Sequence, residues 1–285
     1  MRALLFALLL PLSVWGYEYE LSVVLLFQNE ARFLKEWLEY HKLVGVQHFF
    51  LYNNLSDDDY LEVLEPYLAS GEVELVDVPI LTLNQPDNLK VQCDVYNRAI
   101  QAAKGRTKWL ALIDADEYLV PLEHNTVTEL LREYEPYGGL HANWLNFGTS
   151  GIERIPDDKL RIEALLRCNI VSENLGKSIV RPERVEKSTD PHVYLYLPPY
   201  YHVNTNFERF GWLSVQSGTR KRLMIYHYYT GDLDHLINTK FPRRVLWYPY
   251  LQLESYLKHV EIYNRRVNKT MLRFVPQVRK AVFGE

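Results

Sequence analysis

The stretch Trp109-Leu110-Ala111-Leu112-Ile113-Asp114-Ala115-Asp116 decides the fold of this chain. Its short, continuous apolar run predicts a parallel β-strand that is covered on both faces. Two carboxylates follow where this strand ends, and the crevice outside the carboxyl ends of parallel strands is where open α/β sheets bind ligands. Asp114 and Asp116 would repel each other there unless a cation joined them, and hard oxygen ligands of this kind suit Mg²⁺ or Mn²⁺. A solvated turn is the alternative interpretation, because Asp-x-Asp triplets are common in loops.

The sequence around this stretch alternates strands and helices. In the first half, strands are expected at 21–27, 46–52, 72–78 and 109–113, and helices at 30–44, 57–70 and 90–104. Such alternation predicts an α/β fold with a mostly parallel central sheet, right-handed crossovers and flanking helices. In the less regular second half, the expected elements are a helix at 126–134, strands at 139–147, 177–180 and 192–197, and a mostly helical stretch from 232 to 267. No repeat or low-complexity linker is visible, so residues 17–285 are predicted to form one domain.

The composition is that of an ordinary globular protein. The 285 residues are 47% hydrophobic and 24% charged, and this length fits one large α/β domain. The net charge of −4 gives no electrostatic reason to expect nucleic acid binding. Tyrosine is frequent, with 21 residues, and its rings suit the faces of sugars, although they also simply fill cores.

The N-terminus has the pattern of a secretory signal peptide. Met1-Arg2 supplies a positive start, residues 3–14 are almost wholly apolar, and cleavage is expected after Gly16. A short membrane anchor is the alternative, although the apolar run is shorter than the ~20 residues that span a bilayer as a helix.

In an oxidising compartment Cys93 and Cys168 could form one disulfide, but the sequence does not bring them together.

Polar clusters follow the strands of the first half or precede the fourth one. They are Gln28-Asn29-Glu30, Asn53 to Asp58, Gln92 to Arg98, and Asp114 to Glu117. Each cluster could cap a helix, because Asn, Ser and Asp favour those positions. Capping explains less well why the clusters collect on one edge of the predicted sheet. That edge would present amide and carboxylate groups to a base and a ribose, beside a metal ion for a diphosphate.

These clusters and several later motifs resemble the GT-A glycosyltransferases, and more closely glycosyltransferase family 92, over roughly residues 21–245. The matching stretches are Asn29-Glu30, Glu36 to His41, Gly45 to Phe49, Tyr52 to Asp58, Lys108 to Pro121, Trp144 to Gly151, Lys177 to Pro182, His192, His227-Tyr228 and Lys240. Two positions depart from the pattern. Ile152 stands where the family often has histidine, which bears on acceptor preference, and Ala115-Asp116-Glu117-Tyr118 replaces the commoner Leu-Asp-Glu-Phe.

The resemblance implies a GT-A type, Rossmann-like fold with a helical C-terminal extension. It also implies transfer of a sugar, expected to be galactose from a UDP-sugar, to a glycan or glycoconjugate acceptor with inversion at the anomeric carbon. Mn²⁺ or Mg²⁺ on the acidic triplet would neutralise charge that grows on the leaving diphosphate. Inversion requires a carboxylate to take the acceptor proton. By analogy this base follows the strand that ends at Phe147, where Glu163 and Glu153 are the candidates.

The roles of the remaining site residues are expected from the same resemblance. The third metal ligand is expected to be His192, with His227 as its rival, and either histidine could instead be a packing residue. The residues expected to contact the nucleotide-sugar are Asn29, Glu30, Asn54, Asp58, Asn97, Lys177 and His227. Lys177, Arg181 and Lys240 could neutralise phosphate, or be solvated surface cations.

Two other functions fit parts of the sequence. A nucleotidyltransferase could use the same sheet edge, but it would favour a glycine-rich loop after the first strand, and Phe27-Gln28-Asn29-Glu30 has none. A secreted glycan-binding module without turnover would be supported by loss of the aspartates, and both are present.

Because nucleotide sugars are available in the Golgi lumen, the expected location is the secretory pathway (Golgi or ER lumen) or a membrane-associated position.

Overall fold

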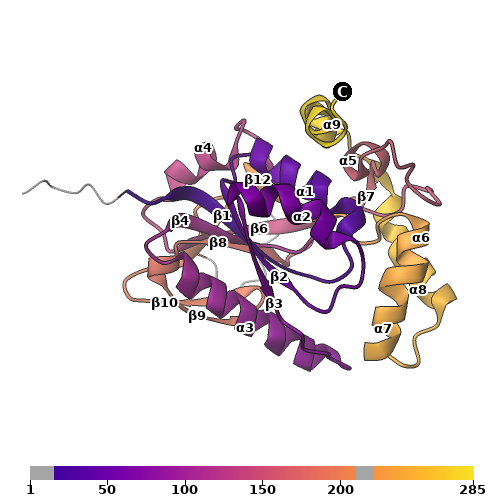
Figure 1. Cartoon of the computed structure of the whole chain (residues 1–285), viewed down its shortest axis with the longest axis horizontal. Helices are drawn as coiled ribbons and strands as arrows, with labels where there is room; N and C mark the ends of the chain where they lie inside the picture. Colours follow the sequence, from indigo (N-terminus) through magenta and orange to yellow (C-terminus); the bar gives the residue numbers. More distant parts are fainter. Residues whose placement is uncertain (1–15, 210–220) are drawn as a thin grey trace, which may run out of the picture.

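The computed structural model describes residues 16–209 and 221–285. Within this part of the chain a nine-stranded sheet forms the centre, and helices cover both of its faces (Figure 1). The predicted signal segment, residues 1–16, lies outside the described residues except for Gly16. Every helix in the described ranges is too short or too polar to span a lipid bilayer.

The first half of the sheet is parallel and follows the predicted alternation. Its strand order is β3-β2-β1-β4, and the bounds are β1 (Tyr19–Phe27), β2 (His48–Asn53), β3 (Val73–Asp77) and β4 (Thr107–Leu112). The crossover helices are α1 (Ala31–Leu43), α2 (Tyr60–Ser70) and α3 (Gln85–Ala103). All seven predicted elements are present, with ends shifted by a few residues. The carboxyl ends of β1, β2 and β4 therefore meet along one edge.

The second half of the sheet mixes parallel and antiparallel pairs. Its order continues β4-β8-β6-β12-β5, with β11 added beside β6. The bounds are β5 (Glu117–Pro121), β6 (Gly139–Asn146), β8 (Gly176–Val180), β11 (His202–Asn204) and β12 (Leu223–His227). Strand β8 is antiparallel to both β4 and β6, whereas β12 is parallel to β6. The predicted α/β class with a mostly parallel sheet is confirmed, but β5 and β12 are strands that the sequence did not predict.

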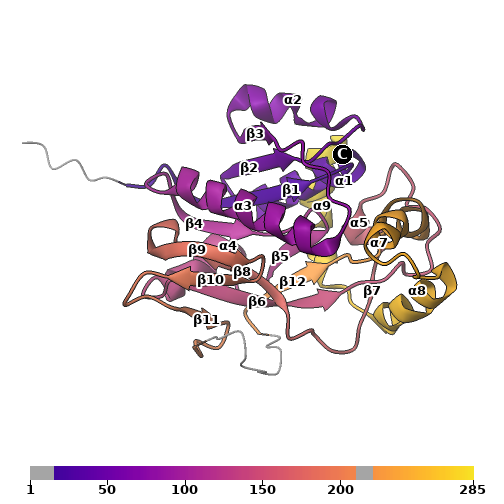
Figure 2. The ribbon, with the colours of Figure 1, turned by 90° about the horizontal axis from the view of Figure 1, so that it is seen from below.

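Smaller elements surround this sheet. Figure 2 shows α3 and the hairpin of β9 (Val185–Asp190) and β10 (Val193–Tyr196) together on one face. On the chain between β5 and β8 lie α4 (Val127–Leu131), η1 (Arg132–Tyr134), α5 (Arg161–Ala164) and β7 (Arg167–Cys168), and η2 (Pro182–Arg184) follows β8. The predicted helix at 126–134 is thus one short α-helix followed by a 3-10 turn.

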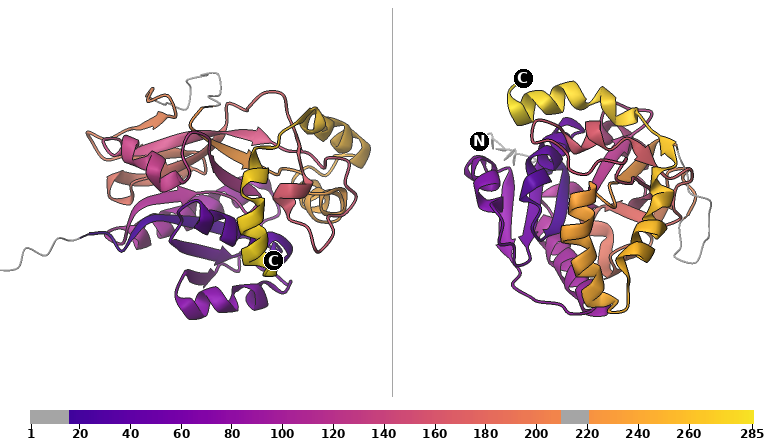
Figure 3. Two further views of the ribbon diagram at one scale, coloured as in Figure 1. Left: turned by 90° about the horizontal axis from the view of Figure 1, so that it is seen from above. Right: turned by 90° about the vertical axis from the view of Figure 1, so that its right-hand side faces the viewer.

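The C-terminal part is a helical extension, as predicted. It contains α6 (Leu233–His235), the π-helical turn η3 (Leu236–Lys240), α7 (Phe241–Trp247), α8 (Leu253–Val260), η4 (Glu261–Asn264), β13 (Arg266–Val267), η5 (Thr270–Arg273) and α9 (Val275–Phe283). The two-residue β13, which pairs with β7, lies at the end of the stretch that was predicted to be mostly helical. Helix α9 returns to pack against α1 (Figure 3).

The core explains why β4 reads as a continuous apolar run. Trp109, Ala111 and Ile113 belong to the hydrophobic cluster that includes α1, whereas Leu110 and Leu112 pack into the cluster around α3. Both faces of β4 are therefore buried, as in other covered parallel strands. This burial fixes the end of β4, so the acidic triplet that follows is presented at the edge of the sheet.

Helix α1 ends where the chain must turn tightly toward β2. Gly45 has a φ of +107°, and a Cβ built there would lie 2.7 Å from Oγ1 of Thr128. A side chain at this position would be strained by its backbone angle and would also clash with Thr128. Glycine is therefore required at this junction, which sets where β2 begins.

Candidate functional site

A pocket of about 860 Å³ lies at the carboxyl ends of β1, β2 and β4. One wall, which we call the first wall, comes from the first half of the chain. It consists of the ends of these strands, the loop after β3 and the start of α3. The second wall comes from β6, β8, β12, residue 173 and the segment η3–α7. Figure 1 shows α6, α7 and α8 grouped beside this end of the sheet. The hydroxyl of Tyr248, just after α7, also donates a hydrogen bond to the side chain of Gln85 in α3.

Asp114 lies at the boundary of the two walls. One of its carboxylate oxygens accepts a hydrogen bond from Nε2 of Gln92 at 2.8 Å, and the other lies 2.9 Å from Nζ of Lys177. Lys177 comes from β8 and is almost fully buried. Burial alone would lower the pKa of Lys177, but the charges of Asp114 and Glu117 outweigh it and hold that pKa above its usual range. Lys177 is therefore a fixed positive charge beneath the pocket.

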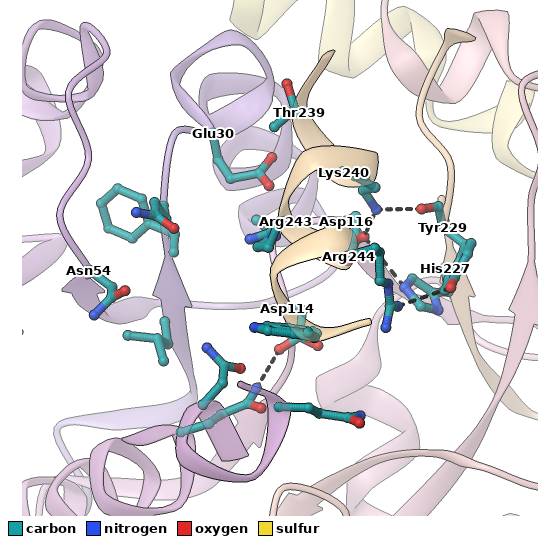
Figure 4. Close-up of a pocket in the computed structure, with 18 of the residues that line it drawn as sticks. Glu30, Asn54, Asp114, Asp116, His227, Tyr229, Thr239, Lys240, Arg243 and Arg244 are labelled. Atoms are coloured by element: carbon teal, nitrogen blue, oxygen red, sulfur yellow. Dashed lines mark hydrogen bonds and ion pairs between the residues drawn. The ribbon is translucent and has the colours of Figure 1, made fainter. Parts of the chain in front are cut away.

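Asp116 is the more enclosed of the two aspartates. Its side chain is 14% exposed, and one oxygen contacts both Nζ of Lys240 and Nε2 of His227, the latter at 3.4 Å (Figure 4). Burial alone would raise the pKa of Asp116, but the charges of Lys240 and His227 together hold it well below its usual range. Asp116 is therefore a carboxylate at neutral pH. Lys240 is the last residue of the π-helical turn η3, a kind of irregularity that is frequent at functional sites.

Glu117, the third acidic residue of this motif, has a structural role. Its side chain is buried, and one carboxylate oxygen accepts the backbone N–H of Asp114 at 2.9 Å. Burial raises the pKa of Glu117 well above its usual range. Asp114 and Asp116 are the two carboxylates of the motif that line the pocket, and Lys177 and Lys240 contact them.

Two buried charged residues, Glu36 and Arg161, support the acidic motif from beneath. Glu36 of α1 accepts the backbone N–H groups of Arg161 and Ile162, at 2.6 and 3.0 Å, where α5 begins. The guanidinium of Arg161 donates to the carbonyl oxygen of Ala115 at 3.1 Å and stacks 3.7 Å from the ring centroid of Phe33. Burial raises the pKa of Glu36 to about 7. This arrangement fixes the backbone between the two aspartates.

Predicted residues in the first wall have mixed roles. Glu30 lines the pocket and points toward Thr239 and Lys240, while Arg161 lies 3.9 Å behind its carboxylate (Figure 4). Asn54 also lines the pocket, but its amide donates to the carbonyl oxygens of Val78 and Ile80, at 2.7 and 3.0 Å. Asn54 therefore holds the loop after β3 in addition to facing the pocket.

Eight of the predicted site residues are brought together in the pocket. They are Asn29, Glu30, Asn54, Asp114, Asp116, Lys177, His192 and His227. Asp58 and Asn97 do not line it: Asp58 accepts the backbone N–H of Ala31 at 2.8 Å, and Asn97 exchanges two hydrogen bonds with the backbone of Ser188. Both therefore hold neighbouring segments in place, and the nucleotide contacts expected from these two residues stay untested predictions.

The two candidate bases also lie outside the pocket lining. Glu163 accepts the N–H of Leu160 at 3.1 Å, where it caps α5, and forms an ion pair with Arg279 at 2.8 Å. Glu153 is exposed in the loop before α5. The structure therefore separates both carboxylates from Asp114 and Asp116, and their catalytic roles stay untested predictions.

The pocket contains carboxylate ligands for a divalent cation, but not a complete set of ligands. Within residues 16–209 and 221–285, no three His, Cys, Asp or Glu side chains form a group that could hold a metal ion, so Asp114, Asp116 and His192 do not make the predicted triad. The imidazole of His192 instead approaches the carbonyl oxygen of Gly176 at 2.7 Å. Mg²⁺ is commonly held by one or two carboxylates together with substrate phosphates and water. The two aspartates therefore fit a cation whose other ligands come from a bound diphosphate.

The second wall contains residues that the sequence analysis missed. It includes Trp144, Asn146 and Glu173 near β6, and Arg243 and Arg244 in α7. Trp144 and Asn146 belong to a motif that was noted only for its family resemblance. Adjacent arginines in a stretch expected to be helical were the available signal for α7. Glu173 carried no local signal, because its loop becomes part of the pocket only when β6 and β8 pair.

The chain matches proteins with a common family description. Residues 18–234 match the model of glycosyltransferase family 92. A family 92 protein from Oryza sativa subsp. japonica is 28% identical over 233 residues, which is 81% of this chain and 36% of the relative. One from Arabidopsis thaliana is 28% identical over 184 residues, which is 61% of this chain and 30% of the relative. The chain thus spans between 30% and 39% of the length of the curated relatives it matches.

Solved structures with similar folds are more distant. The 1–349 fragment of S. aureus TarS in complex with UDP-GlcNAc is 14% identical, with a TM-score of 0.37, and the match covers 67% of this chain and 59% of that one. Glucosyl-3-phosphoglycerate synthase from Mycobacterium tuberculosis, in complex with Mn²⁺, UDP-glucose and phosphoglyceric acid, is 16% identical, with a TM-score of 0.33. That match covers 59% of this chain and 58% of the other.

Proposed function

Because this chain belongs to glycosyltransferase family 92, we propose that it transfers a hexose from a nucleoside-diphosphate sugar to a glycan or glycoconjugate. UDP-galactose is the proposed donor, from the family resemblance of the motifs. The observation that carries the proposal is the charge arrangement of the pocket. Asp114 and Asp116 are each matched by a lysine, and the further cations Arg243 and Arg244 line the same pocket.

These charges suit a diphosphate that bridges the two walls. In the free pocket, Lys177 and Lys240 already offset the negative charges of Asp114 and Asp116. A diphosphate that binds there therefore needs additional positive charge from other residues. Arg243 and Arg244 supply it, and guanidinium groups bind phosphate oxygens with two parallel hydrogen bonds. We place the nucleoside along the first wall, near Glu30 and Asn54, because polar groups at the ends of β1 and β2 can pair with a base and a ribose.

A divalent cation, Mn²⁺ or Mg²⁺, is part of this proposal. Asp114 and Asp116 would hold it, and when bound it supplies Lewis-acid stabilisation of the charge on the leaving diphosphate. Lys240 contacts Asp116 and would share that carboxylate. The protein's own cations, Lys240 and Arg243 above all, stabilise the same developing charge from fixed positions.

The second wall suits a sugar acceptor. The rings of Trp144 and His227 have centroids 4.9 Å apart, and those of Tyr229 and Tyr263 are 5.3 Å apart, so aromatic surface continues along this wall. Aromatic rings with polar tips present both an apolar face and a hydrogen-bonding group to a sugar. We propose that the acceptor hydroxyl attacks from the β6 and β12 part of this wall. The leaving diphosphate lies on the other face of the anomeric carbon, toward the cations of η3 and α7, so the attack inverts that carbon.

The test is a donor screen with the full chain. Thermal shift is measured with UDP-sugars in the presence of Mn²⁺, followed by assays of UDP release with and without glycan acceptors. We expect a UDP-hexose to raise the melting temperature by mass action, and UDP release to require an acceptor. Binding without release for every donor and acceptor would favour a glycan-binding module. Pyrophosphate release from nucleoside triphosphates would favour a nucleotidyltransferase.

We further propose that the enzyme works in the secretory pathway or at its membranes. The support is the apolar segment at residues 3–14 and the availability of nucleotide sugars in the Golgi lumen. A full-length fusion to a fluorescent protein should be protected from protease in intact vesicles. Uniform cytosolic fluorescence with full protease sensitivity would contradict this location.

A further inference from the structure

Four carboxylates line the pocket, and three of them face a cation. Glu30 has Arg161 at 3.9 Å, Asp114 has Lys177 at 2.9 Å, and Asp116 contacts Lys240. Glu173 is the fourth. Within the described ranges it forms no ion pair, and its hydrogen-bond donors are neutral amides. Among these four carboxylates of the described chain, Glu173 is therefore the one with no cation beside it to compete for its oxygen lone pairs.

The position of Glu173 is well defined by its backbone. Its N–H donates to the carbonyl oxygen of Trp144 at 2.8 Å, and its own carbonyl oxygen accepts from the side chain of Asn143 at 3.0 Å. The carboxylate oxygen Oε1 accepts from the side-chain amides of Asn146 and Asn169, each at 3.4 Å. These contacts orient the carboxylate without neutralising it. Its other oxygen, Oε2, has no hydrogen-bond partner in the described chain and remains available to a ligand.

Glu173 lies on the acceptor side of the proposed reaction. Asn146, which donates to it, is the β6 partner of His227 on β12, and the imidazole of His227 reaches Asp116. The ring of Trp144 lies between two imidazoles, 5.1 Å from His192 and 4.9 Å from His227. Glu173 therefore belongs to the second wall. The nucleoside contacts lie on the first wall, so the acidic motif separates the two.

We infer that Glu173 is the general base that accepts the proton of the acceptor hydroxyl, an inference that rests on the proposed glycosyl transfer. The acceptor oxygen forms a bond to the anomeric carbon while the bond from that carbon to the diphosphate oxygen breaks. The bonding electron pair leaves on the diphosphate of the released nucleotide. The hydroxyl proton moves to the Glu173 carboxylate and is later lost to water, so the carboxylate is regenerated.

The main experiment compares Glu173→Gln with the parent chain. We expect the variant to keep the UDP dissociation constant and the donor KM within about twofold, because the residue does not contact the nucleotide. Its kcat for transfer should fall by ~10²–10⁴-fold, the range typical of general base catalysis. Glu186→Gln is the matched control, an exposed position on β9 that should transfer at the parental rate.

Each outcome bears on one claim. If the parent releases no UDP from any donor, the proposed function fails. If the parent transfers sugar and Glu173→Gln transfers at the same rate, only the assignment of the base is overturned. Should Glu173→Gln fail to fold, Glu173→Asp replaces it as the variant. This shorter carboxylate should lower kcat by about tenfold or more while UDP affinity is kept, and parental kcat would overturn the assignment.

Discussion

The two walls of the pocket are built in different ways. In the first wall, each functional residue follows its own strand along the chain, as Glu30 follows β1, Asn54 follows β2 and Asp114 follows β4. In the second wall, the residues come from distant segments: Lys240 meets Asp116 across 124 residues of chain. The proposed nucleotide side of this site therefore depends on local sequence. The cations and the acceptor side depend on how β6, β8, β12 and η3 assemble around it.

Among the residues proposed to bind the donor, the largest effect is expected from the one where the two walls meet. Asp116→Asn removes the charge that Lys240 and His227 both face, and it removes one proposed cation ligand. We expect transfer to fall by roughly 10²–10³-fold, the size of loss seen when one group that stabilises the transition state is removed. Initial rates of UDP release measure this effect, with the exposed Asp94→Asn on α3 as control. Parental rates in Asp116→Asn would show that the walls do not meet at this carboxylate.

The same variant should also change how stability depends on pH. The folded-state pKa of Asp116 lies well below its unfolded value, which is about 3.9. Its carboxylate therefore contributes stability above that unfolded value, and the contribution is lost as pH falls through the lower, folded-state pKa. The difference in unfolding free energy between parent and Asp116→Asn, measured by urea denaturation, should shrink on acidification. A difference that grows instead would contradict the low pKa.

The next prediction concerns the long-range cation of the second wall. Lys240→Gln removes an ammonium group from the proposed diphosphate site, and a hydrogen bond to a charged group is worth about 1.5–3 kcal/mol. UDP affinity should fall by roughly 10- to 100-fold, while uridine affinity stays within about twofold. Calorimetric titrations measure both values, and Lys258→Gln on the exposed face of α8 is the control. Equal losses for UDP and uridine would mean that Lys240 supports the fold and not the diphosphate.

A smaller effect is expected in the first wall. Asn54→Ala removes the two hydrogen bonds that hold the loop after β3, together with an amide that faces the pocket. A lost hydrogen bond of this kind costs about 0.5–1.5 kcal/mol, so UDP affinity should fall roughly two- to tenfold. Asn125→Ala, at an exposed position before α4, is the matched control. An unchanged UDP affinity would remove Asn54 from the nucleotide side, and so would a glycan attached to Asn54.

The smallest effect on transfer is expected at Glu163. Glu163→Gln should cost about 0.5–1.5 kcal/mol of stability, because the side chain caps α5 and pairs with Arg279. Its transfer rate should stay within about twofold of the parent, since Glu163 does not line the pocket. Urea denaturation and UDP release together measure the two effects. A variant that is stable but inactive would restore Glu163 as the base and displace Glu173.

The sequence predicted the part of the fold that short-range patterns determine. The apolar run of residues 109–113 and the acidic triplet after it were sufficient to identify β4 and its ligand-binding end. Lys177 and His227 were expected near a nucleotide, and both line the pocket. The strand β5, which begins at Glu117, was missed because its residues followed directly on an acidic motif and gave no separate signal.

The rest depended on contacts that no local pattern encodes. Glu173 lies in a loop whose backbone bonds to β6 only after β6 and β8 pair. Glu163 was a candidate base for its place after Phe147, but its side chain caps its own helix. Asp58 and Asn97 have the residue types of nucleotide ligands, and both instead satisfy backbone groups of neighbouring segments. Residue type alone does not distinguish these uses.

In the proposed function a nucleoside diphosphate bridges the two walls at Asp116 and Lys240. The most direct test is a calorimetric comparison of UDP and uridine binding to the parent chain in the presence of Mn²⁺. We expect UDP to bind at least about tenfold more tightly than uridine, because the diphosphate adds charge-assisted contacts to the second wall. Equal affinities for UDP and uridine, or no binding of UDP at millimolar concentration, would contradict it.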